Sequence, residues 1–305
     1  MRWFETPNFN FIDAHRIAYA VSGVLVLASI VAIFGLGLNY GIDFSGGKEY
    51  VFQFEQPVDP VETRLLLTEP LDAQPEVRLY GTDTDIMVRT DAEGDITVVR
   101  STIETALTEA YPDNPYIVIK TDIVGPRFAD DLRIAAMNSV FFALAVVFIY
   151  ILIRFKKWYY SAGAVAALFH DVIVVLGVFT LLAEFAPFDV TINQAIIAAF
   201  LTIVGYSLND TVVVFDRVRE NSIVFKTMEF EKMINKSLND TLSRTVITSV
   251  TTLFVVLVLF IFGGEVLKGF SFALVIGVIL GTYSSLFIAS ALVVELERRA
   301  NRVNS

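Results

Sequence analysis

The chain of 305 residues is 55% hydrophobic, and its 33 Asp and Glu residues outnumber its 23 Lys and Arg residues. It has no cysteine, which excludes disulfides and thiol chemistry. Because it has only two histidines, no recognisable ligand spacing and no catalytic set of side chains, the sequence predicts no metal site, no cofactor and no enzyme activity.

Six apolar runs are each long enough to cross a membrane, since about 18 or more apolar residues mark a membrane helix. They cover roughly residues 17–38, 134–153, 159–182, 190–215, 244–262 and 270–294. The first run is longer than a signal-peptide core of about 7–15 residues, so we expect it to be retained as a helix. The sequence therefore predicts a membrane α-helical fold with six transmembrane helices.

Lys and Arg gather in four segments that fall on one side of these helices. The segments are residues 1–16, the turn after the second run, the loop 216–243 and the tail 298–305. Because cytoplasmic segments retain Lys and Arg, we expect both termini in the cytoplasm. Residues 39–131 then lie outside the membrane on the opposite side, and residues 132–297 hold the other five helices.

Residues 39–131 have the pattern of a small α+β domain. Short strand and helix patterns follow in the order β-α-β-β-α-β, which is the ferredoxin-like arrangement with two helices on one face of a sheet. The segment holds 19 Asp and Glu against 7 Lys and Arg. This acidity argues against binding of nucleic acid or anionic lipid. A solvated acidic surface explains it more simply than a role in attracting cations.

The stretch "NYGIDFSGGKEY" joins the first helix to this domain. Its Gly46-Gly47 pair is not followed by the Lys-Ser or Lys-Thr of a phosphate-binding loop, so we expect no nucleotide site. Consecutive glycines instead let the backbone turn sharply or approach a neighbour closely. Gly41, Asp43, Gly46 and Gly47 are therefore expected to form a backbone motif.

Asp210 lies inside the fourth apolar run, although an ionised side chain there costs about 2.5–3.5 kcal/mol on insertion scales. It stands about five residues, or roughly 8 Å, from the end of the predicted helix. Tyr206 and Asn209 extend the same polar face. Arg244 in the next helix should share its depth, with Thr248 one turn along. The spacing favours an Asp210–Arg244 pair, and the alternative is that Arg244 reaches to the membrane interface.

His170 and Asp171 lie near the middle of the third apolar run. Neighbours on a helix project about 100° apart, so they should meet different partners. A histidine titrates near neutral pH and could belong to a proton path. The other interpretation is a hydrogen-bonded pair that ties the third helix to a neighbour, and the sequence leaves both open.

Long motifs in the chain point to a family. They are "GIDFSGG", "HDV", "GYSLNDTVVVFDRVREN", "LSRTVITSVTTL" and "LFIFGGEVLKGFSFALVIGVILGTYSS". Together they closely resemble the SecF members of the SecD/SecF family, which is related to the resistance-nodulation-division (RND) transporters. The resemblance implies a multi-pass protein of the bacterial inner membrane. It further implies use of the proton-motive force, together with SecD, to assist translocation of preproteins.

The resemblance also implies site residues and partners. In that family the acidic residue of the fourth helix, Asp210 here, and the arginine that opens the fifth, Arg244 here, take part in proton movement beside SecD. The implied partners are SecD, the SecY-SecE-SecG channel with SecA, and preproteins, with YajC and YidC as further candidates and no nucleic acid.

Two other functions and one question about the ion stay open. The chain could be a passive assembly subunit in which Asp210 only fixes helix packing. It could also be half of an RND-type exporter of small solutes, although an outer domain of about 90 residues is small for a substrate pocket. The sequence does not decide between protons and sodium ions as the coupling ion.

Overall fold

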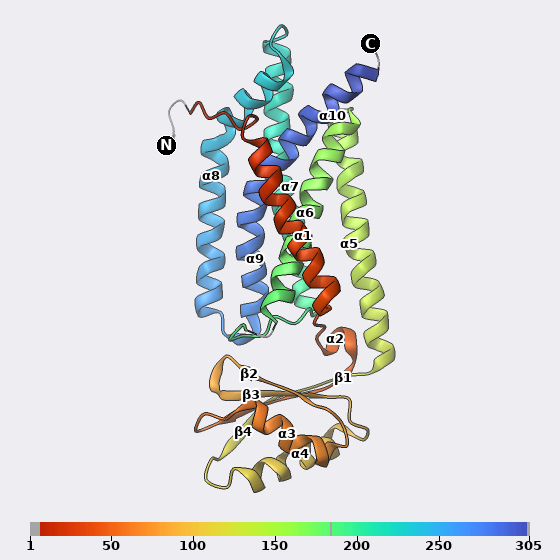
Figure 1. The fold of residues 1–305 in the computed structure, drawn as a ribbon, viewed down its shortest axis with the longest axis vertical. Helices are drawn as coiled ribbons and strands as arrows, with labels where there is room; N and C mark the ends of the chain where they lie inside the picture. Colours follow the sequence, from red (N-terminus) through yellow and green to blue (C-terminus); the bar gives the residue numbers. More distant parts are fainter. Residues whose placement is uncertain (1–6, 184, 304–305) are drawn as a thin grey trace.

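The computed structural model describes residues 7–183 and 185–303 of the chain. Helices long and apolar enough to span a membrane stand side by side, and a small α/β domain caps one end of the bundle (Figure 1). The first and last described residues lie at the opposite end of the bundle (Figure 1). The spanning helices are α1 (His15–Leu36), α5 (Pro126–Phe155), α6 (Trp158–Leu182), α7 (Gln194–Val224), α8 (Phe230–Phe262) and α9 (Glu265–Ser284).

The α9 helix continues without a break into a π-helical turn, Ser285–Ala289, and then into α10 (Ser290–Val303). In their most apolar stretches, α6 and the continuous α9–α10 unit are 56% buried, whereas α5 and α8 are 6% and 11% buried. The bundle is therefore centred on α6 and α9, and α5 and α8 face outward. The six predicted spans are confirmed.

Small residues let α9 lie close to α7. A β-carbon added at Gly277 would lie 2.3 Å from the Ile203 side chain, and one at Gly281 would lie 3.0 Å from Ser207. Both distances are too short for an ordinary contact, so a β-carbon at either position would force its neighbour to shift. The small residues of α9 thus form a packing face, as is common between membrane helices.

Two helices run further than their apolar runs. The α7 helix continues to Val224 and α8 begins at Phe230, so most of the predicted loop 216–243 is helical. These extensions pack against each other through buried residues, and Asn221 Nδ2 donates to Ser237 Oγ over 2.8 Å. The hydropathy pattern did not predict these extensions, because only the face of each helix that contacts protein is apolar. Polar residues on the other faces lower the mean hydropathy of the segment.

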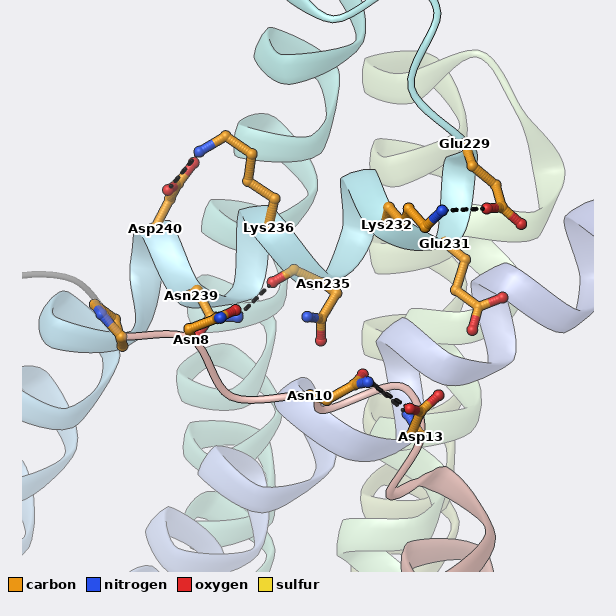
Figure 2. A pocket seen from close by; sticks show the side chains of 11 residues that line it. Asn8, Asn10, Asp13, Glu229, Glu231, Lys232, Asn235, Lys236, Asn239 and Asp240 are labelled. Atoms are coloured by element: carbon orange, nitrogen blue, oxygen red, sulfur yellow. Dashed lines mark hydrogen bonds and ion pairs between the residues drawn. The ribbon is translucent and has the colours of Figure 1, made fainter.

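Residues near the N-terminus lie across the extension of α8. Phe9 N donates to Asn239 Oδ1 and Phe11 N donates to Asn235 Oδ1, each over 2.8 Å. Asn235 and Asn239 stand beside this segment in a polar groove (Figure 2). The two amides hold the chain where it enters α1.

The α/β domain confirms the predicted order of elements. It consists of β1 (Gly47–Phe54), α3 (Pro60–Leu71), β2 (Glu76–Tyr80), β3 (Thr82–Thr90), α4 (Ile96–Ala110) and β4 (Tyr116–Val124). The strands form an antiparallel sheet in the order β2-β3-β1-β4. Asp59 and Asp95 cap the first turns of α3 and α4. Both helices cover the sheet face that points away from the bundle (Figure 1).

Candidate functional site

Asp210 is held by hydroxyl groups from two other parts of the bundle. On α8, Thr245 Oγ1 donates to Asp210 Oδ1 over 2.6 Å. In the π turn after α9, Ser285 Oγ donates to Asp210 Oδ2 over 2.7 Å. Both donors are fully buried, while Asp210 itself is half-buried. Each carboxylate oxygen therefore has a neutral donor, and three helical segments meet at this acid.

Arg244 does not form the predicted ion pair with Asp210. Within the described residues no salt bridge joins the two side chains, and Arg244 is exposed. Thr245 follows Arg244 by one residue, which turns it about 100° around the helix and into the bundle. The threonine thus takes the place expected for the arginine. Arg244 still acts electrostatically on the carboxylate.

Asp171 is a second buried carboxylate and is fully enclosed. His170 Nδ1 lies 2.9 Å from its Oδ1, while Ser207 Oγ of α7 and Ser284 Oγ of α9 donate to its Oδ2 over 2.9 and 2.7 Å. The His170 ring also lies beside the Tyr283 ring, with 6.2 Å between centroids. The two side chains therefore bond to each other instead of meeting only separate partners, and Asp171 joins α6, α7 and α9.

The other polar residues on the predicted faces divide into two groups. Tyr206 OH donates to Ser249 Oγ over 3.0 Å, and Ser249 Oγ lies 2.7 Å from Thr282 Oγ1, so a hydroxyl chain crosses α7, α8 and α9. Asn209 is exposed and Thr248 is half-buried. In the part of the chain that the structure describes, neither hydrogen-bonds to Asp210.

Sequence reasoning missed the hydroxyl donors to both acids. They are Ser207, Thr245, Ser284 and Ser285. The serines of α9 belong to a small-residue face, for which close packing is a sufficient explanation. The available signal was that these hydroxyl residues stand in the apolar run that carries Asp210 or in the two runs that follow it.

The glycine motif fastens the start of α7 to the α/β domain. Asp43 lies in a single helical turn, α2 (Ile42–Ser45), and its Oδ2 accepts from Gln194 N of α7 over 2.9 Å. Gly41 N donates to Ile192 O over 3.0 Å. Gly46 and Gly47 have φ angles of +74° and +113°, which side chains other than glycine rarely adopt. The sharp turn expected here is present.

A buried ion-pair network makes a second joint between the domain and the bundle. Arg89 Nε donates to Glu49 Oε2 over 2.5 Å, and Arg89 Nη2 lies 3.3 Å from Asp189 Oδ2 in the α6–α7 connection. Lys120 Nζ lies 2.7 Å from Glu49 Oε1. Burial opposes the charge on Glu49, but Arg89 and Lys120 outweigh it and hold the pKa of Glu49 below its ordinary value.

Comparisons with known proteins place the chain in a family. Residues 102–299 match the family model "Protein export membrane protein SecD/SecF, C-terminal", and residues 31–58 match "SecD/SecF GG Motif". The chain is 54% identical to the protein translocase subunit SecF of Rhodothermus marinus, covering 98% of this chain and 97% of that one. It is 40% identical to that of Calditerrivibrio nitroreducens, covering 94% and 93%.

Solved structures agree with these relatives. The chain is similar to SecDF of Thermus thermophilus, described as a translocon-associated membrane protein, with a TM-score of 0.86, 34% identity and 97% of this chain covered. It matches SecDF in a super-membrane-facing form with a TM-score of 0.72 and 34% identity over 99% of this chain. It spans 40% of the length of either SecDF chain. By full-length sequence identity, family model and fold, the chain belongs to the SecF family of protein translocase subunits.

Proposed function

We propose that this chain works with SecD in the bacterial inner membrane and uses an ion gradient to draw preproteins outward. The termini are cytoplasmic in this proposal, and the α/β domain faces the outer side. The carrying observation is Asp210, a carboxylate within a membrane helix whose two oxygens accept only from Thr245 and Ser285 among the described residues. Such an acid can exchange a proton without breaking an ion pair.

Protonation of Asp210 changes what its neighbours can do. An ionised carboxylate only accepts hydrogen bonds, whereas a protonated one must also donate. Ser285 Oγ has a second acceptor, Thr282 O, at 3.1 Å. When a proton reaches Asp210, Ser285 can turn to its own helix and Thr245 can accept from the acid. Loading and release of a proton thus alter the contact of α7 with α8 and α9.

The gradient supplies enough energy for such a change. A proton that crosses 100 mV gains about 2.3 kcal/mol. Two arrangements of the bundle that differ by a few kcal/mol can therefore exchange populations when protons move. The two SecDF structures match this chain with different TM-scores at the same identity, which supports more than one arrangement of this fold in relatives.

Helix α7 offers the route from Asp210 to the outer domain. It is one helix of 31 residues, and Asp43 binds the first residue of its first turn. Asp189, a few residues before this turn, pairs with Arg89 of the sheet. A tilt of α7 at Asp210 would therefore move the glycine motif and the α/β domain together.

SecD is the expected partner at the open side of the Asp210 site. Arg244 and Asn209 are exposed on α8 and α7 in the single chain. An exposed arginine within a membrane helix is costly unless it meets protein or water. A SecD helix with its own acidic residue would satisfy Arg244 and close the site. The SecY-SecE-SecG channel, SecA, YajC and YidC belong to the wider proposed assembly.

The test is preprotein export by vesicles that contain this chain, SecD, the channel and SecA. Proton and sodium gradients are imposed in turn, and the wild type is compared with Asp210→Asn. Glu220→Gln is the matched control, because Glu220 lies on the same helix and is exposed. We expect Asp210→Asn to abolish the gradient-dependent part of export and Glu220→Gln to leave it unchanged.

Three results would separate the alternatives. Stimulation by only one gradient identifies the coupling ion. Loss of assembled complex in Asp210→Asn, with gradient dependence intact in the remainder, would favour the passive assembly subunit. Export that ignores both gradients in the wild type would contradict the proposed ion coupling altogether.

A further inference from the structure

Two adjacent serines each donate a hydrogen bond to a different carboxylate of the bundle. Ser284 Oγ donates to Asp171 Oδ2, and Ser285 Oγ donates to Asp210 Oδ2, each over 2.7 Å. Successive residues project about 100° apart on a helix. The end of α9 therefore stands between the two acids and contacts both.

Each serine has a second acceptor on its own helix. Ser284 Oγ lies 3.3 Å from Gly281 O, and Ser285 Oγ lies 3.1 Å from Thr282 O. A hydroxyl has one proton and donates to one acceptor at a time. An ionised carboxylate holds that proton strongly, whereas a protonated carboxyl competes less well with the carbonyl. Each serine can thus switch position with the charge of its acid.

The helix is locally adaptable at this point. The π turn begins at Ser285, and π turns interrupt the regular pattern of backbone hydrogen bonds. The carbonyl of Ser285 accepts from Ser290 Oγ over 3.0 Å. A small rotation of this turn changes the geometry of Ser285 and also that of Ser284 before it. Such turns often occur at functional sites.

Asp171 has the surroundings of a proton-binding group. It is faced by Ser207 from α7, Ser284 from α9 and His170 from its own helix. Within residues 7–183 and 185–303, no Lys or Arg forms a salt bridge with it. His170 Nε2 is buried and has no hydrogen-bond partner in the described part of the chain. The hydrogen-bond partners of Asp171 in the described part of the chain are therefore two hydroxyls and one imidazole.

We propose that the His170–Asp171 pair is a second proton-binding site and that Ser284 and Ser285 couple its protonation to that of Asp210. The proposal rests on the proposed function only in taking Asp210 to exchange protons. A proton on one acid moves its serine, shifts the π turn and changes the donor offered to the other acid. The two acids then titrate as a coupled pair and not independently.

Infrared spectroscopy tests the coupling without an export assay. The full chain, assembled with SecD in lipid vesicles, is titrated while the C=O stretch of protonated carboxyl groups is recorded. Subtracting the Asp171→Asn or Asp210→Asn spectrum isolates the band of each acid. We expect a pH-dependent band from each. In Asp171→Asn the midpoint of the Asp210 band should move by about one pH unit, the size typical of coupled sites.

Serine variants keep the test decisive if Asp171→Asn fails to assemble. Ser284→Ala retains both carboxylates, and we expect it to change the frequency of the Asp171 band and to move the midpoint of the Asp210 band. Ser271→Ala is the matched control, because Ser271 is a buried serine of α9 that donates only to its own helix. It should leave both bands unchanged.

Either of two results would overturn the coupling. One is the absence of any pH-dependent band that Asp171→Asn removes. The other is an Asp210 midpoint that is the same in the wild type, Asp171→Asn and Ser284→Ala. These results are distinguishable from failure of the proposed function, which shows as export indifferent to ion gradients even where both acids titrate.

Discussion

Carboxylates that bond to other side chains inside this molecule are of two kinds, and their partners differ. In the α/β domain, Glu49 is 3% exposed and lies between Arg89 and Lys120. In the bundle, Asp171 and Asp210 are bonded by serine and threonine hydroxyls. A cation stabilises only the ionised acid, whereas a hydroxyl can donate to the ionised form or accept from the protonated form. Glu49 is therefore held in its ionised form, whereas Asp171 and Asp210 have partners that suit either protonation state.

The positions of the two kinds match what each can do. The fixed network lies at the boundary between the sheet and the bundle, where Arg89 also reaches Asp189. The changeable acids lie between α6, α7, α8 and α9. In the proposed function, the charge-fixed joint transmits movement without responding to pH near neutrality, and the inner acids are the groups that respond to the proton gradient. We therefore expect substitutions in the ion-pair network to lower the stability of the chain. Substitutions beside the inner acids should instead change the pH dependence of export.

The largest effect on stability should come from breaking the fixed network. Arg89→Met leaves Glu49 and Asp189 without their shared cation, and loss of one partner from a buried ion pair costs about 3–5 kcal/mol. We expect a clear drop in the thermal unfolding midpoint of the purified chain. Arg100→Ala is the control, because its pair with Glu104 is exposed and such pairs contribute about 0–1 kcal/mol. Equal midpoints for the two variants would refute the fixed joint.

Low pH should weaken the same ion-pair network by protonating Glu49. The folded-state pKa of Glu49 lies below its ordinary value of 4.5, so the folded chain stabilises the ionised form. That contribution is fully present above about pH 4.5 and is lost as the pH falls through the folded-state pKa. Glu49→Gln should be less stable than the wild type at neutral pH and should lose less stability on acidification. Parallel acid-unfolding curves for the two proteins would contradict this account.

Breaking the link between the glycine motif and α7 should have a smaller effect on stability. Asp43→Ala removes the carboxylate that accepts from Gln194 N, and a hydrogen bond to a charged group contributes about 1.5–3 kcal/mol. We expect faster amide hydrogen exchange in the first turn of α7, measured by mass spectrometry on the whole chain. Asp59→Ala removes a similar bond at the start of α3 and should leave α7 unchanged. Protection of α7 equal to that in the wild type would remove Asp43 from the proposed route.

Features that depend on residues close together in the chain could be predicted from the sequence. Features that depend on contacts between distant residues could not. Six helices follow from hydropathy, because lipid contact demands long apolar runs. Depth along a helix also follows, so Asp210 could be matched to the level of Arg244 and Thr245, near the middle of α8. The direction in which a residue projects from its helix does not follow from its depth. For that reason the sequence predicted Arg244 as the partner of Asp210, whereas Thr245 is the residue that contacts it.

Other contacts had no signal in the pattern. Arg89 and Asp189 are 100 residues apart, and no periodicity links a strand to a connection between helices. The serines of α9 lie in a face of small residues, where close packing already explains them. A hydroxyl can pack and donate at once, so composition alone does not separate the two roles. The bonds to Asp171 and Asp210 require the structure.

The smallest and most specific effect concerns one hydroxyl at the inner site. Thr245→Val keeps the shape of the side chain but removes the donor to Asp210 Oδ1, a bond of 2.6 Å. A hydrogen bond to a charged acceptor contributes about 1.5–3 kcal/mol, but the site remains half-buried and Ser285 still donates, so we expect the lower end of that range. The variant takes a donor from the ionised carboxylate and an acceptor from the protonated one. Because the bond to the ionised form is charge-assisted and stronger, the balance between the two states shifts toward the protonated form.

The measurement for Thr245→Val is the pH dependence of gradient-driven export in vesicles. We expect the midpoint of that dependence to shift while the amount of assembled complex stays constant. Thr248→Val is the matched control, since Thr248 lies one turn along α8 and makes no hydrogen bond to a carboxylate in the described part of the chain. A shift in both variants would indicate a general effect of α8 packing. A shift in Thr245→Val alone would show that Asp210 changes its charge during export. Glu49 differs in this respect, because its neighbouring cations keep it ionised.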